Sequence, residues 1–328
     1  MTGTSRNNRK TRYANPKDQA ALELLLKRNA PSSCNRSTSG QVARAIEDQA
    51  AWLAGNGESR SCGALIRLDD CHIELLTPDP SCPDHAQLHQ LLDRCERRAV
   101  QFGILSVKLA VAAELEEWLA GLGYRRPHET PGCLDSESES LLTRSLARRQ
   151  TRFSRSVRAI NLELGIPPDY GRQHRLALQP EASQLESLGE DVFGREVFLS
   201  PGAANAWFRM RDGAADEGIE LLPVSAYRSV NYQRGLVERK LEQGHSMEQI
   251  LAVSAAPGYS EHHTGRAIDI TTPGFDVLEE TFEHSPAFQW LNAHADDYGF
   301  RLSYPKNNRH HVAYEPWHWF YTVNGPWS

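Results

Sequence analysis

The second half of the chain contains no cysteine. All six cysteines of the 328-residue sequence lie in the first 133 residues, and none belongs to a Cys-x-x-Cys pair. A cysteine nucleophile is therefore excluded from the second half, and a structural zinc knuckle is not expected. Free thiols are expected rather than disulfides in a protein that is not secreted. The cysteines are Cys34, Cys62, Cys71, Cys82, Cys95 and Cys133.

The sequence also lacks long apolar runs and an excess of positive charge. No apolar run approaches the roughly 18 residues that a membrane helix needs, and the basic residues near Met1 are not followed by a hydrophobic stretch. The formal net charge of -6 argues against a general nucleic-acid binder. We therefore expect a cytoplasmic protein that binds neither nucleic acid nor membranes.

Length and composition predict two globular domains. Hydrophobic residues make up 40% and charged residues 24% of the chain, an ordinary balance for a folded protein, and 328 residues exceed one typical domain. The polar residues 1–20 are expected to be a disordered tail. A first domain is expected over residues 21–147 and a second over 148–328. The charged stretch 138–158 is expected to close the first domain and link it to the second.

The first domain alternates strands and helices. Two strands are predicted at 63–68 and 72–76, a helix at 88–102, a strand at 105–111 and a helix at 113–122; an earlier helix is predicted at 43–54. The order resembles half of a GNAT acetyltransferase fold. Those enzymes hold pyrophosphate on a glycine-bearing loop, whereas residues 78–87 contain three prolines, two acidic residues and no glycine. The resemblance therefore implies a degenerate, accessory domain rather than acetyl transfer.

The second domain is predicted to be α+β, because helices alternate with short strands. Ser200 and Pro201 fit the start of a helix, and further helices are expected at 232–241, 246–253 and 286–298. Strands are expected at 219–224, 267–270 and 300–304. Residues 235–254 are expected to form a helical insert, and His245 within it is expected to be exposed and to have no functional role.

Three residues of the second domain could hold a metal ion. His262 and Asp269 are separated by a turn at Gly265, and His318 could supply a third ligand, which is the set of a catalytic zinc site. Glu315 lies three residues before His318 and could exchange a proton with water. One histidine alone is usually a surface or hydrogen-bonded core residue, but here two separate segments supply ligands together. The remaining histidines of this region are expected to have no metal role: His263, His284, His294, His310 and His311.

These segments resemble the VanY-type D-alanyl-D-alanine carboxypeptidases of the LAS group of zinc peptidases. The pattern Ser-x-His-x-x-Gly-x-Ala-x-Asp occupies residues 260–269, and Glu-Pro-Trp-His occupies residues 315–318. Ser-x-Tyr-Arg-Ser occupies residues 225–229, with Gln233 five residues after the arginine. Order and spacing agree over about 100 residues, so the resemblance implies the LAS fold and one zinc ion per chain.

The resemblance also implies roles for individual residues. His262, Asp269 and His318 match the zinc ligands, and Glu315 matches the general base and acid. Arg228 and Gln233 match the groups that hold the terminal carboxylate or the neighbouring carbonyl of the substrate, because arginine offers a rigid fork of donors.

Three further residues are assigned to the pocket with a structural alternative for each. Ser260 is expected to contact the substrate or orient His262, and otherwise to cap a turn. Tyr304 and Trp317 are expected to wall the pocket, and otherwise to be core residues. A surface ion pair is the alternative for Arg228.

The expected function is release of terminal D-alanine from peptidoglycan stem peptides or muropeptides. An L,D-carboxypeptidase acting on recycled tetrapeptides is favoured over a D,D-carboxypeptidase acting on pentapeptides, because the protein is expected in the cytoplasm. The alternatives are a non-catalytic module that binds wall peptides, and a D-Ala-D-Ala dipeptidase or endopeptidase of the same family. Glu315 argues against the binding module, since binding alone needs no general base.

Overall fold

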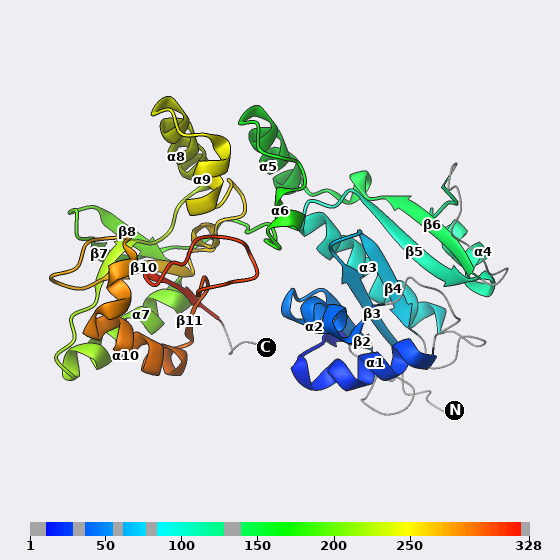
Figure 1. Cartoon of the computed structure of the whole chain (residues 1–328), viewed down its shortest axis with the longest axis horizontal. Coiled ribbons are helices and arrows are strands. Elements are labelled where there is room, and N and C mark those ends of the chain that lie inside the picture. The colour runs from blue at the N-terminus through cyan, green and yellow to red at the C-terminus, as the bar shows by residue number, and fades with distance from the viewer. Residues whose placement is uncertain (1–10, 29–36, 55–61, 77–83, 128–138, 323–328) are drawn as a thin grey trace, which may run out of the picture. The chain divides into compact units, whose positions relative to one another are not determined.

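A computed structural model of the chain describes residues 11–28, 37–54, 62–76, 84–127 and 139–322 (Figure 1). The chain divides into two compact units, Met1–Thr151 and Arg152–Ser328. No helix in the described part of the chain combines the length and the apolar character that a bilayer span requires. The mixed helix and sheet composition confirms the predicted fold class.

The first unit is built on one six-stranded sheet. The strand order follows the sequence, and every neighbouring pair is antiparallel except β4 and β5, which are parallel and connected through a helix. The strands are β1 (Thr11–Tyr13), β2 (Ala51–Ala54), β3 (Cys62–Arg67), β4 (His72–Leu76), β5 (Ser106–Ala112) and β6 (Glu139–Ser145).

Helices α1 and α2 pack on this sheet through a shared apolar cluster. Leu22 and Leu25 of α1 and Ile46 of α2 meet Leu53 and Leu65 of the sheet, and burying such side chains stabilises each by about 1.5–3 kcal/mol. Helix α3 contributes a separate buried face with helical spacing. The helices are η1 (Pro16–Asp18), α1 (Gln19–Arg28), α2 (Ser39–Glu47), α3 (His85–Gln101), α4 (Ala113–Gly121) and η2 (Ala147–Arg149).

Two predictions for the first unit are wrong. Residues 11–20 are not a disordered tail, because β1 pairs with β2 and the ring of Tyr13 lies 5.4 Å from that of Trp52. The helix predicted over 43–54 is instead the end of α2 followed by β2, with a reversal at Gln49 (φ 51°). A short apolar run that is buried on both faces has no period that separates strand from helix. Residues 1–10 and most of the proline-rich stretch 78–87 lie outside the described residues.

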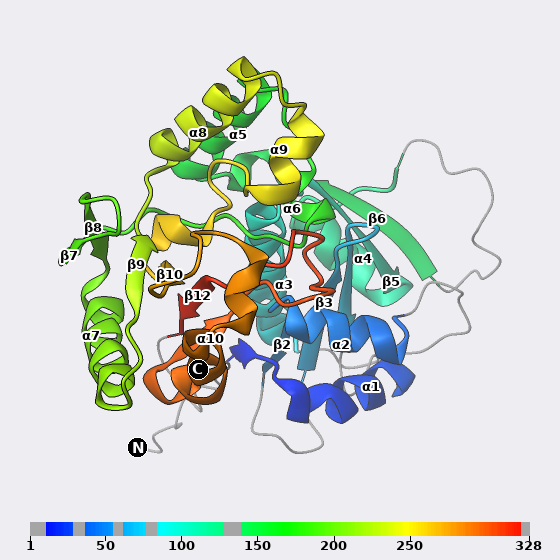
Figure 2. The same ribbon diagram turned by 60° about the vertical axis from the view of Figure 1, so that its left-hand side comes forward.

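The second unit carries a four-stranded antiparallel sheet, in the order β11-β12-β10-β9, and a separate hairpin of β7 and β8. Strands β9, β10 and β12 lie side by side (Figure 2). The strands are β7 (Glu186–Glu190), β8 (Glu196–Leu199), β9 (Leu222–Ser225), β10 (Ala267–Thr271), β11 (Phe300–Leu302) and β12 (His318–Tyr321).

Helices of the second unit enclose two apolar clusters. One cluster joins Trp207 of α7 and Leu291 of α10 to Ile268 and Trp319 of the sheet. The other joins α5, α6 and α9 to buried aromatic side chains such as Tyr304. The α-helices are α5 (Arg152–Glu163), α6 (Tyr170–Gln173), α7 (Pro201–Asp216), α8 (Val230–Glu242), α9 (Met247–Val253) and α10 (Pro286–His294), and the 3₁₀ helices are η3 (Glu261–Thr264), η4 (Glu280–His284) and η5 (Ala295–Tyr298).

The charged stretch 138–158 closes the first unit and leads into the second. It contains β6, η2 and the first half of α5, and the two units meet between Thr151 and Arg152. Helix α5 is rich in arginine, but it buries Ser154, Val157 and Asn161, which share one face of the helix.

One cysteine of the described residues agrees with the prediction of free thiols. Cys95 is buried and carries a free thiol. Cys34, Cys82 and Cys133 lie outside the described residues.

Candidate active site

Three elements of the second unit bring the proposed metal ligands together. His262 lies in η3, Asp269 in β10, and His318 at the start of β12. Strands β10 and β12 pair antiparallel with Asp269 opposite His318, so residues 49 positions apart become neighbours. Gly265 (φ 63°) ends η3 in the left-handed conformation and turns the chain from His262 into β10.

The three ligand residues form one tight, buried group. A ligand atom from each of His262, Asp269 and His318 lies within 4.8 Å of the other two. Asp269 Oδ2 is 3.3 Å from His262 Nε2, and Asp269 Oδ1 is 3.1 Å from His318 Nδ1. All three side chains are almost completely buried.

The second nitrogen of each histidine ring is also held. His262 Nδ1 is 2.6 Å from the carbonyl oxygen of Ala226, which leaves Nε2 to face Asp269. His318 Nε2 is 3.0 Å from Glu261 Oε2, and Ser303 Oγ donates to the same oxygen at 2.6 Å. Outer hydrogen bonds of this kind fix the tautomer and orientation of a histidine ligand.

Glu261 is a residue of the site that the sequence patterns did not identify. It lies between Ser260 and His262 in a position that the motif leaves open. Its partner His318 is 57 residues away, so only the pairing of β10 with β12 brings the two side chains together.

The two histidines of the group have pKa values that shift in opposite directions. Burial by itself lowers the pKa of His318, but hydrogen bonds to Asp269 and Glu261 outweigh burial and raise it to about 10. Burial, together with Arg228, lowers the pKa of His262 to about 4. Asp269 stays ionised, since both histidines outweigh the effect of burial and hold its pKa well below the usual range.

One buried nitrogen atom without a hydrogen-bond partner is also consistent with a metal site. His262 Nε2 is buried and has no hydrogen-bond partner, because its 3.3 Å approach to Asp269 lacks hydrogen-bond geometry. Two imidazole nitrogens and a carboxylate oxygen that converge this closely suit a metal ion, and they match the donor types that zinc prefers.

Glu315 lies beside this group and differs from the other carboxylates. Its Oε2 is 3.8 Å from His318 Nδ1. Burial raises the pKa of Glu315 to about 7, and the attraction of His318 offsets only part of that effect. A carboxyl group with a pKa near neutrality can both accept and release a proton, which is what general acid and base catalysis requires.

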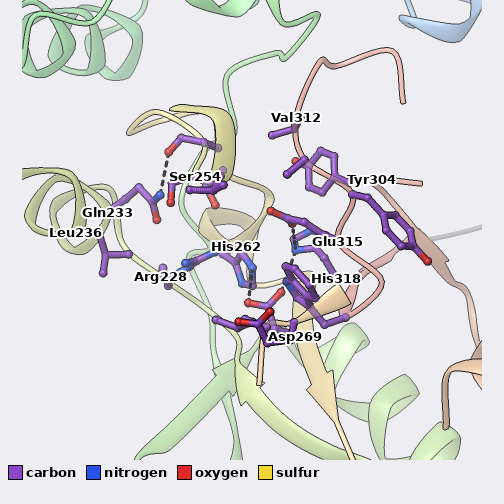
Figure 3. A pocket seen from close by; sticks show the side chains of 18 of the residues that line it. Arg228, Gln233, Leu236, Ser254, His262, Asp269, Tyr304, Val312, Glu315 and His318 are labelled. Atoms are coloured by element: carbon purple, nitrogen blue, oxygen red, sulfur yellow. Dashed lines mark hydrogen bonds and ion pairs between the residues drawn. The ribbon is translucent and has the colours of Figure 1, made fainter. Parts of the chain in front are cut away.

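These residues line a single cavity of about 480 Å³. Figure 3 shows Gln233, Leu236 and Ser254 on one side of it and Glu315 and His318 on the other, with Arg228 beside His262 between them. All nine residues that the sequence assigned to the site line this cavity: Arg228, Gln233, Ser260, His262, Asp269, Tyr304, Glu315, Trp317 and His318.

Arg228 and Gln233 each have a buried polar atom without a partner in the protein. Arg228 Nε is buried without a hydrogen bond. Gln233 Nε2 donates to the carbonyl oxygen of Ala255 at 2.8 Å, while Gln233 Oε1 is buried without a partner. Ser260 begins η3 without a side-chain capping bond, so the turn-capping alternative does not hold.

The aromatic residues have both pocket and core contacts. Tyr304 is buried in a core cluster, and its ring centroid lies 4.9 Å from that of His318. Trp317 packs partly against the other cluster. His263 is structural: Gly258 N–H donates to its Nε2, and its Nδ1 holds the carbonyl of Arg228 at 2.6 Å.

Fold and geometry together define a class: an α+β unit with a buried His–Asp–His group, an adjacent carboxyl group of raised pKa and an open cavity. Residues 196–324 match the family model VanY, described as D-alanyl-D-alanine carboxypeptidase. The chain belongs to the VanY family of D-alanyl-D-alanine carboxypeptidases.

Named relatives agree with this family. The chain is 33% identical over 132 residues to the bifunctional D-Ala-D-Ala dipeptidase and D-Ala-D-Ala carboxypeptidase VanXYC of Enterococcus gallinarum, covering 38% of this chain and 68% of that protein. It is 34% identical over 163 residues to YodJ of Bacillus subtilis (strain 168), which is named as a carboxypeptidase; this match covers 48% of this chain and 57% of YodJ. Among solved structures, the LdcB LD-carboxypeptidase is 35% identical, with a TM-score of 0.40 and coverage of 43% of this chain and 69% of LdcB.

Proposed function

We propose that the second unit is a zinc-dependent carboxypeptidase that releases terminal D-alanine from peptidoglycan stem peptides. The observation that carries the proposal is the His262–Asp269–His318 group beside Glu315, in a cavity that also presents the guanidinium of Arg228. Membership of the VanY family supports the choice of substrate class.

His262, Asp269 and His318 would hold the zinc ion. When bound, zinc supplies Lewis acidity that lowers the pKa of water and polarises a carbonyl group. Glu315 takes a proton from the water that attacks the scissile carbonyl carbon. As the C–N bond breaks, Glu315 returns this proton to the leaving amine, and the products are free D-alanine and the shortened peptide acid.

Arg228 and Gln233 would select and position the end of the peptide. A guanidinium binds a carboxylate through two parallel hydrogen bonds, which distinguishes a chain end from a chain middle. Gln233 Oε1 is an unpartnered acceptor, so it suits a substrate N–H group rather than a carboxylate oxygen. Fixing the terminal residue at two points would place the scissile carbonyl for attack.

Within this class, we assign the L,D reaction on tetrapeptides first and the D,D reaction on pentapeptides second. VanXYC is named for two different activities on D-Ala-D-Ala, as a dipeptidase and as a carboxypeptidase. Membership of the family therefore does not decide between the L,D bond of a tetrapeptide and the D,D bond of a pentapeptide. Identifying the peptide that the protein shortens would decide it.

The test is incubation of the zinc-loaded protein with defined tri-, tetra- and pentapeptides, with the released residue identified by mass spectrometry. The expected result is one D-alanine released from the tetrapeptide, and none after chelation of the metal or in His318→Ala. Release of the D-Ala-D-Ala dipeptide would show a dipeptidase instead. Tight binding of stem peptides without any cleavage would favour the binding module.

A further inference from the structure

Helix α8 contributes a second cation to the cavity. Gln233, Leu236 and Lys240 are spaced i, i+3 and i+7, which places them on one face of the helix, and all three line the cavity. The carboxypeptidase motifs of this sequence do not include Lys240, so the proposed function leaves this residue without a role.

Lys240 is half-buried, and its ammonium group is held near Ser254 and within electrostatic reach of Arg228. Its Nζ donates to Ser254 Oγ at 2.9 Å, and Ser254 lies on the same side of the cavity as Gln233 (Figure 3). Burial lowers the pKa of Lys240, and the nearby positive charge of Arg228 lowers it further, against an opposing effect of Glu315.

Neither cation has a carboxylate partner among the residues that the structure describes. Lys240 donates to a hydroxyl group, and the buried Nε of Arg228 makes no hydrogen bond. Two like charges that face one partly dry cavity repel each other, and each lacks the solvation it would have in water. An anionic ligand between them would relieve both effects.

We propose that Lys240 is a specificity-determining residue, which binds the terminal carboxylate of the substrate together with Arg228. The inference rests on the proposed function and deepens it. A carboxylate has two oxygens and room for about four hydrogen bonds, so a guanidinium and an ammonium can share it. Ser254 holds the ammonium group of Lys240 within electrostatic reach of Arg228, where the end of the peptide would lie.

Binding can be measured apart from turnover. Zinc-loaded protein carrying Glu315→Gln would be titrated by calorimetry with matched tetrapeptides that end in a free carboxylate or in an amide. Adding Lys240→Met, which removes the charge and keeps the aliphatic length, is expected to weaken binding of the acid about tenfold or more and to leave binding of the amide unchanged. Lys240→Arg should restore most of the affinity for the acid.

The matched control is Arg234→Met on the same helix. Arg234 pairs with Glu238 and Glu163 and does not line the cavity, so its loss should change neither affinity. An equal loss for the acid and the amide in Lys240→Met would overturn the proposal. So would a loss that occurs with a diaminopimelate peptide but not with a lysine peptide, because Lys240 would then bind a side-chain carboxylate.

The outcome is separable from that of the proposed function. If the wild type releases no D-alanine but prefers acid over amide through Lys240, the proposed function fails and the carboxylate site stands. If the wild type releases D-alanine and Lys240→Met keeps the preference for the acid, the role of Lys240 fails and the carboxypeptidase stands.

Discussion

Glu261 and Glu315 both lie against His318, yet their pKa values shift in opposite directions. Burial would raise both. For Glu261, hydrogen bonds and attraction from His318 outweigh burial and lower the pKa to about 2. For Glu315, burial outweighs the attraction and the pKa rises to about 7. One carboxylate therefore stays ionised and holds the ring, while the other can exchange a proton near neutral pH.

Replacing Glu315 by glutamine should abolish turnover and keep the metal. Glutamine has nearly the same shape but cannot accept a proton from water, and loss of general acid and base catalysis typically costs ~10²–10⁴-fold in rate. Zinc content by atomic absorption and kcat for the tetrapeptide would be measured on the same preparation. Loss of zinc from Glu315→Gln would mean that Glu315 is a ligand.

Replacing Glu261 should weaken zinc binding without direct contact with the metal. Removing the outer partner of a histidine ligand typically costs ~10–100-fold in metal affinity. Glu261→Ala is expected at the upper end of this range, and Glu261→Gln at the lower end, because the amide oxygen can still accept from His318. Competition with a chromogenic chelator would measure the zinc dissociation constant.

Ser303→Ala is the graded control for Glu261, since it removes only the hydroxyl that supports the carboxylate. Its effect should be smaller than that of Glu261→Ala. Unchanged zinc affinity in both Glu261 variants would contradict the orienting role.

At the scale of elements, the turn between η3 and β10 sets the distance between two ligands. Gly265 has φ 63°, and a Cβ at this position would lie 2.9 Å from the backbone nitrogen of Ser200. That nitrogen donates to the carbonyl oxygen of Gly265 at 2.7 Å, so the start of α7 cannot move away without breaking the bond. The glycine of the sequence motif is therefore required by conformation and by space.

Gly265→Ala should lower both stability and zinc affinity. The left-handed conformation costs a non-glycine residue roughly 1–2 kcal/mol, and the close contact adds to this. Gly274→Ala is the control, because Gly274 is also left-handed (φ 88°) but a Cβ there would have no atom of another residue within 4 Å. Denaturant unfolding and zinc titration of both variants would be compared; an equal effect in the two would show that the contact with Ser200 is unimportant.

At the scale of the whole molecule, each unit buries a histidine that resists protonation. Burial lowers the pKa to about 4 for His72 in the first unit and for His310 in the second. An unfolded histidine titrates near about 6.5, so between that pH and about pH 4 the unfolded chain binds protons that the folded chain excludes. The stabilising contribution is complete above about pH 6.5 and is lost as the pH falls toward 4.

The contribution of His72 to the free energy of unfolding of the first unit should therefore decrease as the pH falls from about 7.5 to about 4.5. His72→Gln, which cannot titrate, should flatten this decrease for the first unit, whose Ala110 N–H donates to His72 Nε2. Urea unfolding followed by circular dichroism at several pH values would test this. An unchanged slope in His72→Gln would contradict the assignment.

The sequence by itself determined the family, and it identified residues that the fold brings together: His262, Asp269, His318 and Glu315. Residues 260–269 form one turn and one strand, so their spacing fixes geometry locally, and the motif at 315–318 needs only to be brought opposite them. The start of α7 at Pro201 was equally local, because a Ser-Pro pair favours the first turn of a helix.

The tertiary structure alone decided which other groups act on these residues. Glu261 reaches His318 through the pairing of β10 with β12, and Lys240 faces the cavity because Ser254 of the neighbouring segment holds its ammonium group. The edge strand β1 forms only because β2 offers a partner. In each case the interaction joins residues that are distant in sequence. Local periodicity and motif spacing cannot predict such a contact, because the burial and the charge around a residue depend on which segments pack against it in the folded chain.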